Sequence, residues 1–210
     1  MTVPVCPRCG AALLAPTVMH ERHECPQHGP VAPLHPPLLP GPEALTALAA
    51  DSDVPFWLPW PLPASWLFAG LQLVGGGRQP IDAVTLGFTG HGMSEGPSDL
   101  VIVSEKPGTG LGARWAGAPE PDPDLTTTRP STTKAKVGGW QTPLWSLDAP
   151  GRAAFVGQAA GCWLWLVTWP DTAWPVLDEH LQLVDLRDTP TISDVPTGAL
   201  LPRLHTGPGA

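Results

Sequence analysis

The sequence has few positive charges and no tyrosine. Lysine occurs only at positions 106, 134 and 136, and lysine and arginine together number 11 against 19 acidic residues, which gives a formal net charge of −8. Within residues 1–29 the only arginines are Arg8 and Arg22. A surface that binds nucleic acid needs an excess of positive charge to neutralise phosphates. We therefore expect no direct binding to nucleic acid, and nucleic-acid regulation is the weakest hypothesis for function.

Cysteine is scarce, and no apolar stretch is suited to cross a membrane. Of the 4 cysteines, Cys162 lies in an apolar run where a buried, inert thiol is expected, and no disulfide framework is indicated. The uncharged stretch Val54–Gly77 is interrupted by prolines, and Ala153–Pro170 is at the short limit for a spanning helix. The N-terminus has no basic segment followed by an apolar run. We expect a cytoplasmic protein that does not insert into membranes.

Motifs that bind phosphate through a helix are also missing. No Gly-Lys-Ser/Thr triplet ends a nucleotide-triphosphate loop. Gly108-Thr-Gly-Leu-Gly112 follows an expected strand, but Ala116–Asp124 is acidic and rich in proline, so no phosphate-binding helix is expected after it. We interpret these glycines, and those beside His91, as turn residues.

Two motifs of the same form, Cys-Pro-x-ligand-Gly, lie near the N-terminus: Cys6-Pro-Arg-Cys9-Gly10 and Cys25-Pro-Gln-His28-Gly29. The two-residue spacer lets both ligands of a motif bind one ion, and the glycines suit the left-handed positions of such tight turns. Cys6, Cys9, Cys25 and His28 would fill a tetrahedron and leave no position for water. The sequence therefore predicts a zinc ribbon with a structural Zn²⁺ and no chemistry of its own.

The fourth ligand has alternatives. His20 and His23 also lie close to Cys25, and either could replace His28 as ligand, support the site from outside or stay solvated on the surface. The repeated proline and glycine around His28 favour His28.

We expect two units joined by a connector. Residues 1–29 form the zinc ribbon, in which the metal substitutes for a core that so short a segment cannot build. Residues 30–42 are rich in proline and predict a semi-rigid extended connector. Residues 43–205 form the larger unit, with a mobile loop at 116–137 where prolines and threonines replace any apolar periodicity.

The larger unit is predicted to be an α+β domain, with a mostly antiparallel, Trp-rich sheet and one or two short helices. Pro42–Ala50 has helix formers, a proline suited to the first turn and an early acid. Leu177–Asp188 suits helix and strand alike, and we favour a strand. Six further segments read as strands: Trp66–Val74, Ala83–Thr89, Leu100–Glu105, Trp140–Leu147, Ala153–Gln158 and Cys162–Trp169. The last alternates Trp with Leu, so both of its faces should be buried in the centre of the sheet.

Tryptophan supplies candidate binding groups. Most of the 10 tryptophans should be core residues. Trp57, Trp60 and Trp66 lie in a proline-rich stretch and are expected to be partly exposed, where an indole could stack on a sugar or grip an apolar residue. Our leading hypothesis is a non-catalytic protein that binds a protein or a small ligand.

The alternative hypothesis is an enzyme that acts on a small metabolite. Its site would lie between the ribbon and the sheet and would use Glu105, Arg114 or Asp185. None of these residues has a recognisable catalytic spacing, and the segment Asp185-Leu-Arg-Asp188 is typical of a turn that pairs its own charges.

Beyond the two metal-binding turns, five segments carry a resemblance: Pro59-Trp-Pro-Leu-Pro63, Gly110-Leu-Gly-Ala-Arg-Trp-Ala-Gly117, Thr142-Pro-Leu-Trp145, Trp163-Leu-Trp165 and Asp185-Leu-Arg-Asp188. With them, nearly the whole chain resembles an uncharacterised bacterial family, a domain of unknown function. The resemblance implies no established reaction, substrate or fold. Some members of that family carry the name phosphotransacetylase, which the residues here do not support.

Overall fold

The strand β10 (Cys162–Trp169) is buried at every position. Leu164 and Leu166 pack in one apolar cluster, whereas Trp163 and Trp165 pack in another. Because successive side chains of a strand point to opposite faces, β10 separates two layers of core. Its predicted central position is confirmed, since it lies between β9 and β6 inside the sheet. The computed structural model describes residues 4–18, 21–77, 79–91, 96–125, 130–173, 181–188 and 195–207.

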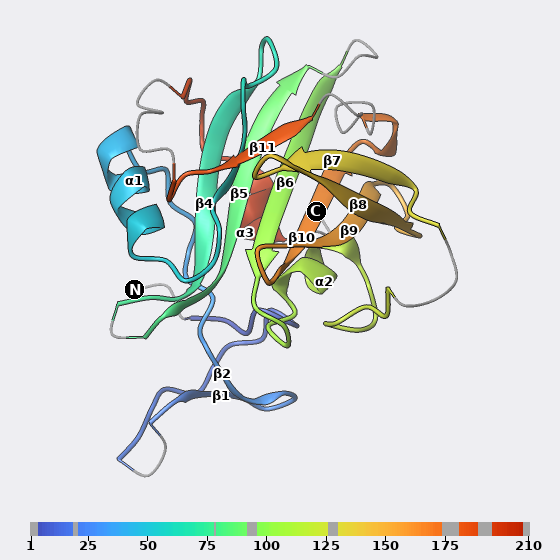
Figure 1. Ribbon diagram of the computed structural model, residues 1–210. Coiled ribbons are helices and arrows are strands. Elements are labelled where there is room, and N and C mark those ends of the chain that lie inside the picture. The colour runs from blue at the N-terminus through green and yellow to red at the C-terminus, as the bar shows by residue number, and fades with distance from the viewer. Residues whose placement is uncertain are drawn as a thin grey trace.

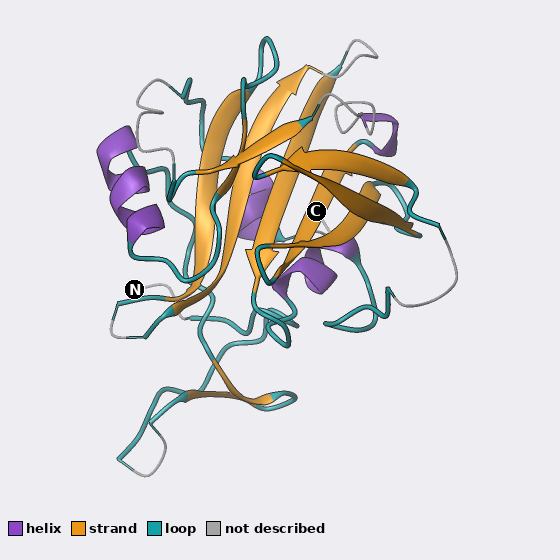
Figure 2. Cartoon of the chain, in the orientation of Figure 1, coloured by secondary structure: helices purple, strands orange, loops and turns teal. Residues whose placement is uncertain are grey.

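Nine strands form one curled sheet in the order β3-β11-β7-β8-β9-β10-β6-β5-β4 (Figure 1). The paired neighbours are antiparallel except β11 and β7, which run parallel. The long strands β4, β5 and β6 form one wall, and β7, β8 and β11 cross in front of it (Figures 1 and 2). The mostly antiparallel fold is therefore confirmed. The remaining bounds are β3 (Trp57–Pro59), β4 (Leu67–Gly75), β5 (Ile81–His91), β6 (Pro97–Glu105), β7 (Thr133–Val137), β8 (Trp140–Leu147), β9 (Ala153–Ala159) and β11 (Gln182–Asp185).

In the part of the chain that the structure describes, three short helices pack against the sheet. The helix α1 (Pro42–Ala50) has its predicted bounds and buries Leu45 and Ala49 in the interior cluster, enclosed by the curl. The helices α2 (Leu111–Ala116) and α3 (Pro202–Thr206) contribute to the second cluster, on the outer face of the sheet. No helix within the described ranges has the length and apolar character needed to cross a membrane.

The observed strands β7 and β11 test two predicted segments, the loop at 116–137 and the strand in Leu177–Asp188. The predicted loop at 116–137 is wrong at its C-terminal end, because Thr133–Val137 forms β7, which pairs with β8 across a tight turn at Gly138-Gly139. Both turn glycines have positive φ angles, 56° and 88°. The β-alternation of β7 is too short to be distinguished from a polar loop in the sequence. For Leu177–Asp188, the strand is confirmed over Gln182–Asp185, and residues 174–180 lie outside the described residues.

The proline-rich connector lies along the edge of β4. Leu38 and Leu71 exchange two backbone hydrogen bonds, with N···O distances of 2.9 and 2.8 Å, and the His35 N–H donates to the Leu73 carbonyl at 2.9 Å. The extended form expected of the connector is thus fixed by pairing with the sheet. The division of the chain into two units with these boundaries stays a prediction.

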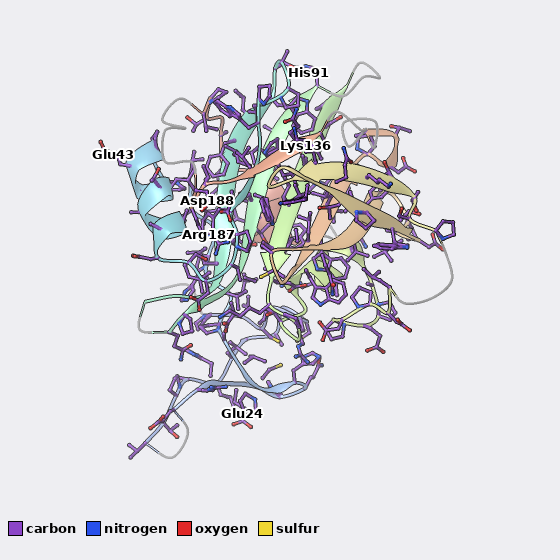
Figure 3. All side chains as sticks on the ribbon, viewed as in Figure 1. Glu24, Glu43, His91, Lys136, Arg187 and Asp188 are labelled. Carbon is purple, nitrogen blue, oxygen red and sulfur yellow. The ribbon has the colours of Figure 1, made fainter. Side chains whose placement is uncertain are left out.

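Before the connector, an N-terminal lobe runs from Pro4 to Val31. It contains the short hairpin β1 (His23–Cys25) and β2 (Gly29–Val31), which is drawn below the sheet in Figure 1. Glu24 lies on this hairpin, whereas Arg187 and Asp188 lie against the sheet (Figure 3).

Candidate metal centre

Two backbone turns bring four donor side chains together in the N-terminal lobe. In the first turn the Gly10 N–H donates to the Cys6 carbonyl at 2.8 Å, and Gly10 has a φ of 74°. In the second, Cys25 ends β1 and pairs with Gly29, which has a φ of 68°. Both glycines therefore occupy the left-handed conformation that the sequence motif predicts.

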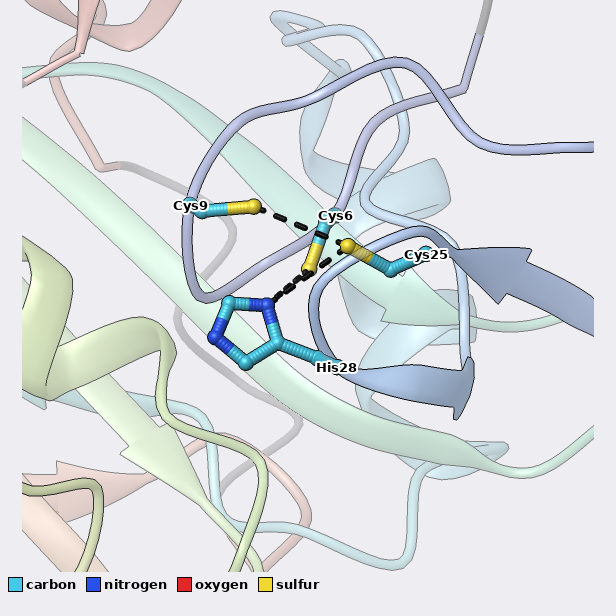
Figure 4. A group of neighbouring side chains, drawn as sticks. All are labelled: Cys6, Cys9, Cys25 and His28. Atoms are coloured by element: carbon cyan, nitrogen blue, oxygen red, sulfur yellow. Dashed lines mark hydrogen bonds between the residues drawn. The ribbon is translucent and has the colours of Figure 1, made fainter.

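The four donor atoms of Cys6, Cys9, Cys25 and His28 all lie within 4.8 Å of one another (Figure 4). The Cys9 and Cys25 Sγ atoms are 3.7 Å apart, and His28 Nδ1 lies 3.6 Å from Cys6 Sγ and 3.5 Å from Cys25 Sγ. Tetrahedral zinc with ordinary Zn–S and Zn–N bonds would separate two sulfurs by about 3.8 Å and a sulfur and a nitrogen by about 3.6 Å. The donor set thus fits such an ion in both chemistry and spacing.

The local environment differs among the thiols. Cys6 and Cys25 are buried, whereas Cys9 is exposed. Burial raises the pKa of the Cys6 thiol to about 11. Burial also acts to raise the pKa of Cys25, but the N–H groups of Gln27 and His28 and the His28 ring outweigh it and lower that pKa to about 6. The second turn therefore supplies donors that stabilise a thiolate, the form that binds metal.

The histidines left open by the sequence have different places. His23 lies on β1, is half-buried and is not part of the four-residue cluster. Its Nδ1 is buried and has no hydrogen-bond partner among the residues that the structure describes. His20 lies outside those residues. Of the histidines described, His28 is the one that joins the three cysteines.

Two arginines connect the metal centre to the sheet domain. Arg8, between the two ligands of the first turn, donates to the carbonyl of Gly108 and, at 3.3 Å, to that of Thr109. Arg114 of α2 lies against Gly10, since a Cβ added there would come within 2.7 Å of its Nη2. Burial lowers the pKa of Arg114, and the charges of Cys9 and Cys6 act in the opposite direction. The cluster thus has a guanidinium beside it.

Glu105 is fully buried and binds the start of α2. Its two carboxylate oxygens accept the N–H groups of Leu111 at 2.7 Å and Gly112 at 3.1 Å. A short helix therefore starts at Leu111, inside the segment Gly108–Gly112 that the sequence predicts to be a turn. The free N–H groups at a helix start attract anions, and here a carboxylate of the same chain already occupies them. Burial, the largest effect, raises the pKa of Glu105 to about 7.

Asp185, at the end of β11, also accepts hydrogen bonds with both of its carboxylate oxygens. Its Oδ1 accepts the Phe56 N–H at 3.2 Å and the Arg187 N–H at 3.1 Å, and its Oδ2 accepts two bonds from the Arg187 side chain, at 2.9 and 2.7 Å. Of Glu105, Arg114 and Asp185, Asp185 alone lines the cavity at the end of β11.

Exposure of the tryptophans differs from the expectation. Trp57 and Trp66 are 4% and 3% exposed, so partial exposure is correct only for Trp60, at 37%. Trp57 is buried because β3 pairs with β11, a partner distant in the sequence. The most exposed of the described tryptophans is Trp140, at 79%. The signal that could have found it is its place directly after the Gly138-Gly139 turn, at the extreme end of a strand.

One further sequence signal is Gly92-Met-Ser-Glu-Gly96, which has the Gly-x-Ser-x-Gly spacing of a nucleophile elbow. An elbow joins a strand to a helix. This segment instead connects β5 to β6, two strands that pair antiparallel, and residues 92–95 lie outside the described ones. Its place in the fold does not match an elbow.

Comparison with known proteins identifies the family without a function. Neither the curated proteins nor the solved structures include a match to this chain. A family model described as "Family of unknown function (DUF6758)" matches residues 1–204. The match extends over the N-terminal lobe, the connector and the curled sheet, so the chain belongs to this family of unknown function.

Proposed function

We propose that this chain is a cytoplasmic, zinc-stabilised and non-catalytic binding protein, whose partner is another protein or a small molecule. The observation that supports this most is the closed donor set of Cys6, Cys9, Cys25 and His28. Four protein ligands saturate tetrahedral zinc, so the ion would have no free position at which to activate water or substrate. Its contribution would be the folding of the lobe.

The second support comes from the acidic residues that could act in catalysis. Both oxygens of Glu105 bind the start of α2, and both oxygens of Asp185 bind the backbone or Arg187. A general base must be free to reach the proton that it removes. These two carboxylates are instead engaged in holding the fold.

Metal analysis of the purified protein tests the proposal. Protein prepared without added metal should contain about one zinc per chain, because the four donors are already grouped. His28→Ala should lose most of it. The matched control is His23→Ala, which removes an imidazole from the same lobe outside the four-residue cluster and should keep the zinc.

Two results would contradict the proposal. One is absence of zinc from the wild type, or retention of zinc by both histidine variants to the same degree. The other is metal-dependent turnover of a small-metabolite panel that is lost together with the zinc, because a saturated structural ion gives no such activity.

A further inference from the structure

A cavity of 630 Å³ opens at one rim of the curled sheet. Four segments contribute to its wall: β3 with Trp57, the β7–β8 hairpin, the β9–β10 turn, and the end of β11 with the following residues up to Asp188. Small-molecule sites commonly have volumes of about 300–1,000 Å³ and lie in the mouths of barrel-like sheets. Its size and place are therefore those of a ligand site.

Trp140 forms an exposed wall of this cavity. It shares a strand face with Thr142 and Leu144, which are buried and point into the interior of the curl. Trp140 continues this inward face but lies beyond the end of the packed core, with 79% of its surface exposed. Trp57, also on the wall, is almost fully buried. A ligand in the cavity would thus meet two indoles, one of them uncovered.

The charged side chains of the cavity wall are those of Asp185, Arg187 and Asp188, and the first two pair with each other. Arg187 directs Nε and Nη2 to Asp185, and Nη1 to the Asp53 carbonyl at 3.0 Å. Both members of the Asp185–Arg187 pair are therefore occupied. Asp188 is exposed, and no described residue is seen to neutralise its carboxylate.

The nearest lysines of the hairpin do not supply a cation to the cavity. Lys134 and Lys136 are exposed and alternate along β7 with the buried Ala135 and Val137. Their side chains therefore leave the sheet on the face opposite to the interior. The cavity carries a net negative charge from Asp188.

We propose that this cavity binds a small organic cation, through its indoles and the carboxylate of Asp188. Aromatic faces attract ammonium and guanidinium groups, most strongly when the cation is poorly hydrated. The Asp188 carboxylate, which has no ion-pair partner among the described residues, disfavours an anion, and the two indoles favour a cation with apolar surface over a hydrated metal ion. This inference rests on the proposed role as a binding protein and gives its ligand a chemical class.

Choline and its neutral isostere, 3,3-dimethylbutan-1-ol, test the charge preference at constant shape. Binding is followed by the ¹⁵N–¹H indole resonances of the full-length, zinc-loaded protein, with Trp140 and Trp57 assigned by substitution. Choline should shift both resonances in a saturable way. The isostere should bind about tenfold more weakly or not at all, because it keeps the contact area and loses the charge.

Three variants locate the site. Asp188→Asn should weaken choline binding about fivefold or more, and this difference should shrink at high salt. Trp140→Ala, at a position 79% exposed where a substitution should change the free energy of unfolding little, should abolish it. Trp60→Ala, the matched control for a second exposed indole outside the cavity, should leave binding unchanged.

Three results would overturn the inference: no saturable shift with choline, equal binding of choline and the isostere, or an unchanged affinity in Asp188→Asn. Zinc content measured on the same samples separates the two proposals. A zinc-loaded protein that ignores choline contradicts only the cation site, whereas a zinc-free protein that binds choline contradicts only the structural metal.

Discussion

Among the residues of the N-terminal lobe that the structure describes, Cys6, Leu13 and Cys25 form the one buried apolar cluster, and two of these three belong to the candidate metal centre. In the sheet domain two large clusters lie on either side of β10, and they include fully buried rings such as Phe68 and Trp165. The comparison indicates two different sources of stability in one chain. The proposed zinc would stabilise the lobe through coordination by a few side chains, whereas the sheet depends on apolar area removed from water.

The largest expected effect comes from removing one metal ligand. In Cys9→Ser the lobe should lose its zinc, and with it a stabilisation on the order of 10 kcal/mol. Cys9 is exposed, so the substitution costs little packing. Every tryptophan lies at position 57 or later, which makes tryptophan fluorescence a reporter of the sheet alone. Its thermal transition should stay close to that of the wild type, and a collapse of that transition would mean that the two regions unfold as one.

The reverse experiment weakens the sheet and spares the lobe. Leu164→Ala on β10 removes a side chain with 0% exposure, and the free energy of unfolding should fall by about 2–5 kcal/mol. The zinc content of the folded protein should not change. Denaturant unfolding followed by fluorescence measures the loss. Leu14→Ala, at a position 59% exposed in the lobe, is the control and should change the sheet's stability by less than about 0.5 kcal/mol.

The smallest effect is a pH dependence confined to the sheet domain. Glu105 has a folded pKa of about 7 against an ordinary value of 4.5, so the folded state holds this proton more tightly than the unfolded state. The linked stabilisation is complete below about pH 4.5 and is lost as the pH rises through 7. Between pH 5 and pH 8 the wild type should therefore lose on the order of 2 kcal/mol relative to Glu105→Gln, which cannot titrate. Parallel stability curves for the two proteins would show that Glu105 does not titrate in this range.

The features that could be predicted from the sequence are those set by neighbouring residues. The tight Cys-Pro-x-ligand-Gly turns are one example, since spacer and glycine together determine where the donors point. The bounds of α1, β8 and β10 are another, because each segment has its own period and its own terminating residues.

The features that could not be predicted depend on residues distant in the sequence or on the edges of the sheet. The six-residue helix α2 is too short to form by propensity, and it is held by Glu105 on the preceding strand. Trp57 is buried because β11 returns beside β3 late in the chain.

The connector covers the edge of β4, where strands of two copies of this protein could otherwise pair. An open β4 edge would present a row of unpaired N–H and carbonyl groups, onto which a strand of a second molecule could add. The connector occupies this edge through Leu38 and His35, and its many prolines lack the N–H groups needed to pass the pairing outward. The segment that joins the two regions therefore also covers the β4 edge of the sheet, and it keeps that edge from pairing with a strand of another molecule.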